Sequence, residues 1–106
     1  MNRGSALKWI DALGAARAKF TTSQLSFVEP SDEIHYCPIG VLANFLAPND
    51  WTLAWDKCSQ LMHGQQFFLP SDLLQKVKAK TNLNAFTQCH SFADAAKFVR
   101  DNYKQL

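Results

Sequence analysis

Residues 35–46 read HYCPIGVLANFL, and this stretch decides how the chain folds. A cysteine stands directly before a proline, and apolar residues at helical spacing follow. Because proline is favoured at the first position of a helix, we expect a helix that begins at Pro38, has Cys37 as its N-cap and ends before Pro48. The residues expected on its buried face are Ile39, Leu42, Phe45 and Leu46.

The residues before this helix alternate between apolar and polar, which is the period of a β-strand. One alternating run covers residues 24–28 and another covers 33–36, and the turn-rich segment EPSD separates them at residues 29–32. We therefore expect a β-hairpin that leads directly into the helix. The side chains expected to face the core are Leu25, Phe27, Ile34 and Tyr36.

Helical patterns also occur elsewhere in the chain. The expected helices span residues 5–18, 51–62, 70–79 and 91–103. Ser5 and Ser91 are their expected N-caps at the two ends of the chain, and Asp94 resembles the acidic member of a capping box. The helix over residues 51–62 is predicted from the recurrence of Trp51, Ala54, Trp55, Cys58, Leu61 and Met62, and Gly64 can terminate it. A short extended piece is expected at residues 66–69.

Length and composition favour one compact unit. The chain has 106 residues, of which 47% are hydrophobic, and neither a linker nor a repeat divides it. We expect residues 1–106 to form a single globular domain. The expected fold class is α+β, a helix-rich single domain with about five helices and one small β-hairpin.

Charge and hydropathy argue against several classes of partner. The net charge is only +2, and the densest basic stretch, residues 76–80, would spread its lysines around a helix. A nucleic-acid surface on that stretch and the last helix is therefore a weak hypothesis. No apolar segment approaches the length needed to cross a bilayer, so no membrane partner is expected. Without a signal-peptide core, and with an odd number of cysteines, the chain is expected to be cytoplasmic.

Cys37 is the one place where the sequence indicates chemistry. A thiol at a helix N-terminus can have a lowered pKa and act as a nucleophile. The candidate bases are His63 and His90, with His35 two residues away on a strand. The residues that could orient a base are Asn84, Gln88 and Asp94. The alternative is that Cys37 is a small buried residue that closes the corner between hairpin and helix.

The sequence does not favour a metal site or a cofactor. The residues that could hold zinc are Cys37, Cys58, Cys89, His35, His63 and His90, but they form no CxxC, CxxH or HxxxH spacing. We expect neither a bound metal nor a cofactor.

Aromatic residues make up 12% of the chain. Phe67 and Phe68 are adjacent and cannot both face inward from a strand, so at least one ring is expected on the surface. Exposed aromatics are frequent at the energetic centres of protein interfaces. Trp51 and Trp55 are further binding candidates, although a core helix accounts better for the spacing of each.

Four motifs, in the same order, resemble a family of small uncharacterised proteins found in phages, other mobile elements and some bacterial chromosomes. They are KWIDAL at residues 8–13, YCPIGVL at 36–42, FLPSDLL at 68–74 and SFADAAKFV at 91–99. The family's central motif reads Tyr-Cys-Cys-Leu-Gly-Val-Leu, so Pro38 stands where a second cysteine is usual. The resemblance implies a compact fold and a mobile-element context, and it supplies no catalytic residues.

These observations favour binding over catalysis. The expected function is that of a phage-type accessory protein that binds and modulates a host or phage protein, in the host cytoplasm if a phage encodes it. Trp51, Trp55, Phe67 and Phe68 are the expected contact residues. The alternative is a cysteine-dependent hydrolase or transferase that uses Cys37 with His63 or His90 as base.

Overall fold

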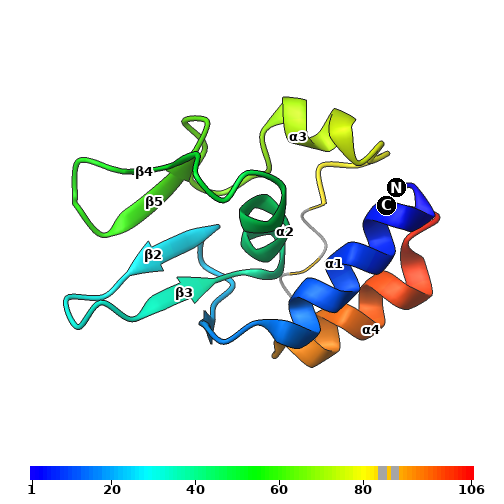
Figure 1. Cartoon of the computed structure of the whole chain (residues 1–106), viewed down its shortest axis with the longest axis horizontal. Coiled ribbons are helices and arrows are strands. Elements are labelled where there is room, and N and C mark those ends of the chain that lie inside the picture. Colours follow the sequence, from blue (N-terminus) through cyan, green and yellow to red (C-terminus); the bar gives the residue numbers. More distant parts are fainter. Residues whose placement is uncertain (84–85, 87–88) are drawn as a thin grey trace.

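The computed structural model describes residues 1–83, 86 and 89–106. Its described part contains four α-helices and a five-stranded mixed sheet (Figure 1). The helices are α1 (Arg3–Ala15), α2 (Pro38–Leu46), α3 (Ser71–Lys76) and α4 (Phe92–Asn102). The strands are β1 (Lys19–Phe20), β2 (Ser26–Val28), β3 (Ile34–Tyr36), β4 (Trp51–Leu53) and β5 (Ser59–Met62). A mixed α+β fold is confirmed, but the prediction of about five helices and one hairpin is wrong.

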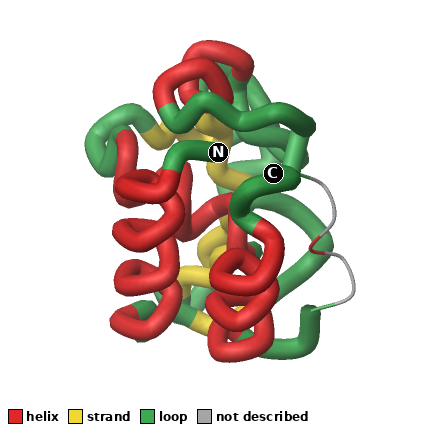
Figure 2. Tube along the Cα trace, turned by 90° about the vertical axis from the view of Figure 1, so that its right-hand side faces the viewer, coloured by secondary structure: helices red, strands yellow, loops and turns green. Residues whose placement is uncertain are grey.

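The sheet has the strand order β1-β3-β2-β5-β4. β1 runs parallel to β3, and every other neighbouring pair is antiparallel. The predicted β2–β3 hairpin is present, and a second hairpin, β4–β5, joins it through the pairing of β2 with β5. In Figure 1, α2 lies between this sheet and the pair formed by α1 and α4, and Figure 2 shows α1 and α4 side by side.

Residues 51–62 form the second hairpin and not the predicted helix. The Asp56 carboxylate closes its turn by accepting hydrogen bonds from the backbone N–H groups of Cys58 and Ser59, both at 2.9 Å. Across the sheet, the Gln60 side chain donates a 2.7 Å hydrogen bond to the hydroxyl of the fully buried Ser26. This turn and this pairing override the helical spacing of the apolar residues.

Gly64 therefore ends a strand and not a helix. His63 and Gly64 have φ angles of +49° and +83°, as the two central residues of a type I′ turn do. Met62 and Gln65 exchange backbone hydrogen bonds across this turn. The chain thus reverses after β5 and returns toward α2.

The start of α2 is as predicted. Cys37 is its N-cap, and its sulfur accepts a hydrogen bond from the Gly40 N–H at 3.2 Å. Gly40 lets another backbone approach, because a β-carbon built there would stand 1.9 Å from the Leu25 carbonyl oxygen. The same oxygen accepts a hydrogen bond from the Cys37 N–H at 3.1 Å. The hairpin and the helix are therefore held together by backbone contact.

Several local predictions need correction. Asn2, not Ser5, caps α1, and its side chain accepts a hydrogen bond from the Ser5 N–H. Ile34 and Phe45 were expected in the core but are 39% and 47% exposed. Ile34 pairs with Val28 at the end of the hairpin next to its turn. The predicted cap of α4 is confirmed, since the Ser91 hydroxyl accepts from the backbone N–H of Asp94.

The core is centred on Trp9 of α1. Trp9 is fully buried, and its indole Nε1 donates a 2.9 Å hydrogen bond to the Pro38 carbonyl oxygen. Its ring lies 5.0 Å from that of Phe86, which in turn lies 5.0 Å from Phe98 of α4. This chain of aromatic contacts connects α1, α4 and the first turn of α2, and it fixes the position of Cys37.

Candidate functional site

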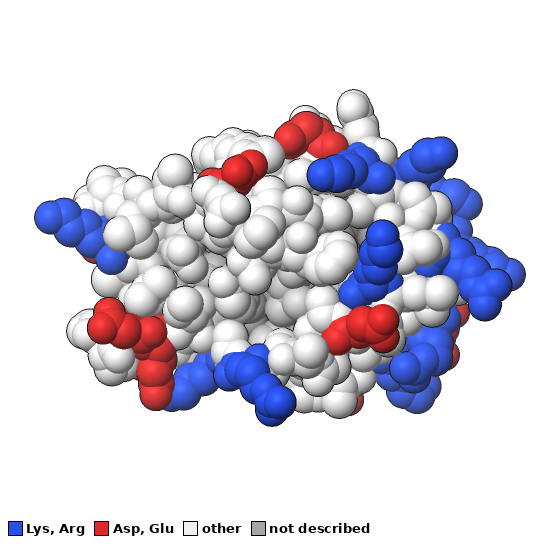
Figure 3. Space-filling view, viewed as in Figure 1, with Lys and Arg blue, Asp and Glu red and all other residues white. Residues whose placement is uncertain are grey.

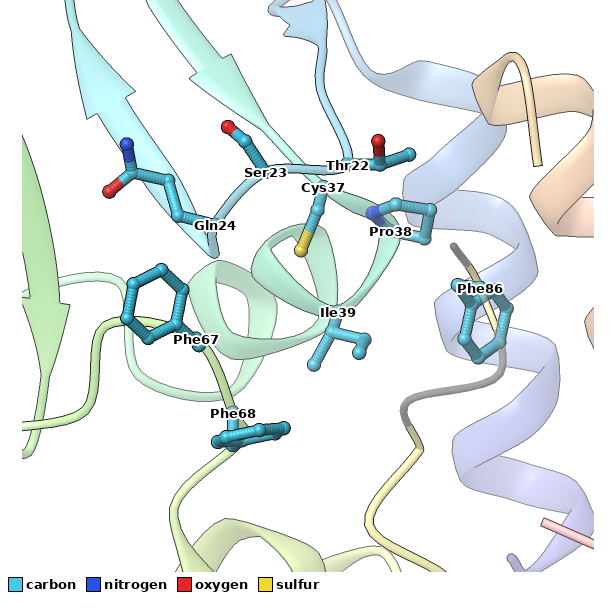
Figure 4. A pocket seen from close by; sticks show the side chains of 9 residues that line it. All are labelled: Thr22, Ser23, Gln24, Cys37, Pro38, Ile39, Phe67, Phe68 and Phe86. Atoms are coloured by element: carbon cyan, nitrogen blue, oxygen red, sulfur yellow. The ribbon is translucent and has the colours of Figure 1, made fainter. Parts of the chain in front are cut away.

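An apolar hollow of about 160 Å³ lies at the beginning of α2, and we call it the Cys37 hollow. Its lining residues carry no formal charge, and they are Thr22, Ser23, Gln24, Cys37, Pro38, Ile39, Phe67, Phe68 and Phe86. Figure 4 shows the Cys37 sulfur directed toward the space that Phe67, Phe68 and Ile39 border. The structure thus brings the candidate nucleophile together with two of the four predicted contact aromatics.

Leu25 explains why residues so distant in sequence meet there. Its carbonyl oxygen accepts from Cys37, and its N–H donates a 2.9 Å hydrogen bond to the Gln66 carbonyl oxygen. The Gln66 side chain donates a further hydrogen bond to Gln24 at 3.1 Å. Leu25 is therefore a bridge between the first turn of α2 and the segment that carries Phe67.

One rim of the Cys37 hollow is polar, and its residues were not among the predicted site residues. The run TTSQ at residues 21–24 directly precedes β2, and Thr22, Ser23 and Gln24 line the hollow. The sequence could have indicated this rim, because four consecutive hydrogen-bonding side chains stand before the predicted hairpin. The hollow therefore pairs an aromatic wall with an uncharged polar rim.

The thiol of Cys37 is protected and not activated. The residue is only 7% exposed, and burial raises its pKa to about 11. Hydrogen bonds from the first turn of the helix act in the opposite direction, but burial outweighs them. The expectation of a lowered pKa at this N-terminus is therefore wrong.

The candidate bases do not line the Cys37 hollow. Neither His63 nor His90 is among its described lining residues. The Asp94 carboxylate accepts a hydrogen bond from the backbone N–H of His90, so it supports the start of α4. Asn84 and Gln88, the other candidates for orienting a base, lie outside the described residues.

His63 instead links two parts of the fold. Its Nε2 lies 2.8 Å from the Asp50 carboxylate, and its Nδ1 lies 2.9 Å from that of Asp72. The hydrogen bond to Asp50, followed by that to Asp72, raises the pKa of His63. An imidazole with both nitrogens facing carboxylates is best satisfied when it is protonated, because each nitrogen then donates.

The four predicted contact aromatics differ in exposure. Trp51 is half-buried and donates a 3.0 Å hydrogen bond from Nε1 to the Asn44 side chain. Trp55, in the β4–β5 turn, is 95% exposed. Phe67 and Phe68 are 53% and 48% exposed. Phe67 and Phe68 therefore have large, half-exposed rings that also line the Cys37 hollow.

One group of side chains offers three possible metal-ligand atoms within 4.8 Å of one another: Glu29, Glu33 and His35, at the β2–β3 hairpin. Their charges already have protein partners. His35 Nε2 lies 2.7 Å from Glu29, and the Lys19 ammonium is ion-paired with Glu33. His35 also stacks on Phe27, with ring centroids 4.1 Å apart. These contacts include one hydrogen bond within the hairpin and one ion pair that connects the hairpin to β1.

Comparison with family models, with curated proteins and with solved structures finds no match to the chain. The motif resemblance to mobile-element proteins therefore stays a prediction. Among the described residues, no helix combines the length and the apolar character that a bilayer crossing requires.

Proposed function

We propose that this protein is a binding module that seats an uncharged apolar side chain of a protein partner in the Cys37 hollow. One observation carries the proposal: the half-exposed rings of Phe67 and Phe68 border the same apolar hollow. Exposed aromatic rings around a small pocket are typical of the residues that dominate binding energy at interfaces.

The chemistry of the lining defines what the hollow accepts. All of its described lining residues are uncharged, so an ionised group would lose hydration there without gaining a partner. The aromatic wall favours an aliphatic or aromatic side chain, and the rim formed by Thr22, Ser23 and Gln24 offers hydrogen bonds to the backbone beside it. A peptide segment with one apolar anchor meets both requirements.

The protected thiol supports binding more than catalysis. A cysteine with a pKa of about 11 is almost entirely neutral near pH 7, and a neutral thiol is a poor nucleophile. Cys37 then acts as a small apolar part of the floor. The hydrolase alternative, with His63 or His90 as base, would require a rearrangement that brings a base to Cys37.

The wider role that we propose is that of a phage-type accessory protein that modulates a host or phage protein in the cytoplasm. The order of the four motifs supports this context, and the Cys37 hollow supplies the contact. A small protein of this kind needs no cofactor, because its effect depends on occupying a surface of its target.

Site-specific photocrosslinking tests the proposal. A benzoylphenylalanine at position 68 is compared with one at position 7, because Leu7 is 49% exposed and Phe68 48%, but Leu7 does not line the hollow. We expect a partner from the source-cell lysate to crosslink at position 68 only, and excess unlabelled protein to compete with it.

The captured protein is then purified and titrated. Phe67→Ala and Phe68→Ala are each expected to weaken its binding at least about tenfold, as substitutions at interface hot spots do. Leu7→Ala is the matched control and should leave the affinity unchanged. Equal crosslinking at positions 7 and 68, or unchanged affinity in both Phe variants, would contradict the proposal.

A further inference from the structure

Although the net charge is low, basic and acidic residues are concentrated in different parts of the chain. Residues 1–18 and 71–106 contain nine Lys and Arg against four Asp, a net charge of +5. Residues 19–70 contain two Lys against five Asp and Glu, a net charge of −3. Figure 3 shows Lys and Arg gathered toward the right-hand end of the molecule, where the two termini lie in Figure 1.

A second hollow lies where this basic part meets α2. It has a volume of about 270 Å³ and is formed by Ser5, Lys8, Leu42, Phe45, Leu46 and Lys76. We call it the Lys8–Lys76 hollow. α1 supplies Ser5 and Lys8, the second half of α2 supplies the three apolar residues, and α3 supplies Lys76. Three separate elements thus place two cations around an apolar floor.

The charges of this hollow are uncompensated. Within the described residues, neither Lys8 nor Lys76 has a carboxylate partner. Asp72, the acidic residue of α3, is ion-paired with His63 and is not available to Lys76. Phe45, on the apolar floor, is 47% exposed. A half-exposed ring and two lysines without carboxylate partners in one hollow are typical of a binding surface.

We infer that the Lys8–Lys76 hollow binds an acidic protein segment that carries one apolar anchor residue. Charge complementarity identifies the partner: carboxylates of the segment pair with the two lysines, and its apolar side chain covers Phe45. A protein segment fits better than a nucleic acid, because the apolar floor makes no favourable contact with a charged phosphodiester backbone. This second surface goes beyond the proposed function of the Cys37 hollow and does not depend on it.

Selection from a library of random dodecapeptides on the whole protein tests this inference. We expect the enriched peptides to carry several Asp or Glu residues around one Leu, Ile or Phe. In titrations, Lys8→Gln and Lys76→Gln together should weaken their binding at least tenfold, and Phe45→Ala should also weaken it. Added salt should reduce the affinity, because exposed ion pairs are screened.

Lys57→Gln is the matched control, since Lys57 is an exposed lysine outside the basic part of the molecule and has no carboxylate partner among the described residues. It should leave binding unchanged, and thermal melts should show that every variant is folded. The absence of any acidic group of sequences among the enriched peptides, or binding of such acidic peptides that survives the double lysine substitution, would overturn the inference. So would a mixed-sequence oligonucleotide that binds more tightly than any selected peptide and competes with it at these lysines.

Discussion

The carbonyl oxygen of Leu25 lies so close to Gly40 that a β-carbon on Gly40 would stand 1.9 Å from it. Both groups are backbone or its direct extension, so no side-chain rotation relieves the clash. The contact joins the start of β2 to the first turn of α2, and it holds the Cys37 hollow in shape.

Gly40→Ala is therefore expected to lower the free energy of unfolding by about 2 kcal/mol or more, as overpacking of a close contact does. The matched control is Gly14→Ala, because a β-carbon on Gly14 meets nothing within 4 Å. Since Gly14 lies in α1, alanine there should stabilise the protein by about 0.5–1 kcal/mol. Urea denaturation measures the free energy of unfolding of both variants. Equal changes would show that the close contact between Gly40 and Leu25 does not exclude a side chain at position 40.

Trp9→Phe should destabilise the protein, because it removes one hydrogen bond and part of a fully buried ring. The indole N–H reaches the Pro38 carbonyl oxygen at 2.9 Å in the core, and phenylalanine leaves that contact unmade. We expect a loss of about 1–2 kcal/mol in the free energy of unfolding. Trp55→Phe is the control, because Trp55 is 95% exposed and should change stability by less than about 0.5 kcal/mol.

The thiol of Cys37 should resist alkylation in the folded protein. Its raised pKa of about 11 and its 7% exposure both predict slow reaction with iodoacetamide near pH 8. Cys58, which is exposed, provides the internal reference. Mass spectrometry of peptides should show Cys58 labelled first and Cys37 only after unfolding. Labelling of Cys37 as fast as that of Cys58 would instead favour the cysteine-nucleophile alternative.

Stability should fall as the pH rises through the pKa of His63. That pKa is raised above the ordinary value of 6.5 by Asp50 first and Asp72 second. The protonated imidazole thus stabilises the fold fully below pH 6.5, and the contribution is lost as the pH passes the raised value. Asp72 shows the reverse dependence, because the hydrogen bond to His63 lowers its pKa below 3.8 and acid removes its contribution.

Thermal melts between pH 5 and 9 measure this effect against the variant His63→Asn. Asparagine tolerates the φ angle of +49° at this position, so the turn is kept while the titrating group is removed. The difference in melting temperature between the two proteins should shrink as the pH rises. A difference that does not depend on pH would show that His63 acts only through the turn.

The sequence predicts the parts of the fold that depend on local chemistry. Cys37 before Pro38 indicates a helix start, and Ser91 three residues before Asp94 indicates another, because caps are satisfied within one turn. The helix predicted over residues 51–62 fails because the hairpin formed there is stabilised in part by pairing with a distant strand. Gln60 pairs with Ser26, 34 residues away, and only Asp56 in the turn hints at the hairpin.

The candidate site was predictable in part for the same reason. Adjacent Phe67 and Phe68 indicate an exposed ring from their spacing alone. Their position beside Cys37 depends on the two backbone hydrogen bonds of Leu25, which no periodicity encodes. The direction of the Cys37 pKa shift depends on burial, and burial is set by packing of the whole domain.

The separation of charge between the two parts of the chain has a consequence for diffusion. The uneven distribution of charge gives the molecule an electric dipole, although its net charge is +2. Such a molecule turns in the field of a charged target before the two surfaces touch. Long-range electrostatic forces therefore orient the molecule before contact, and this raises the fraction of collisions that lead to binding.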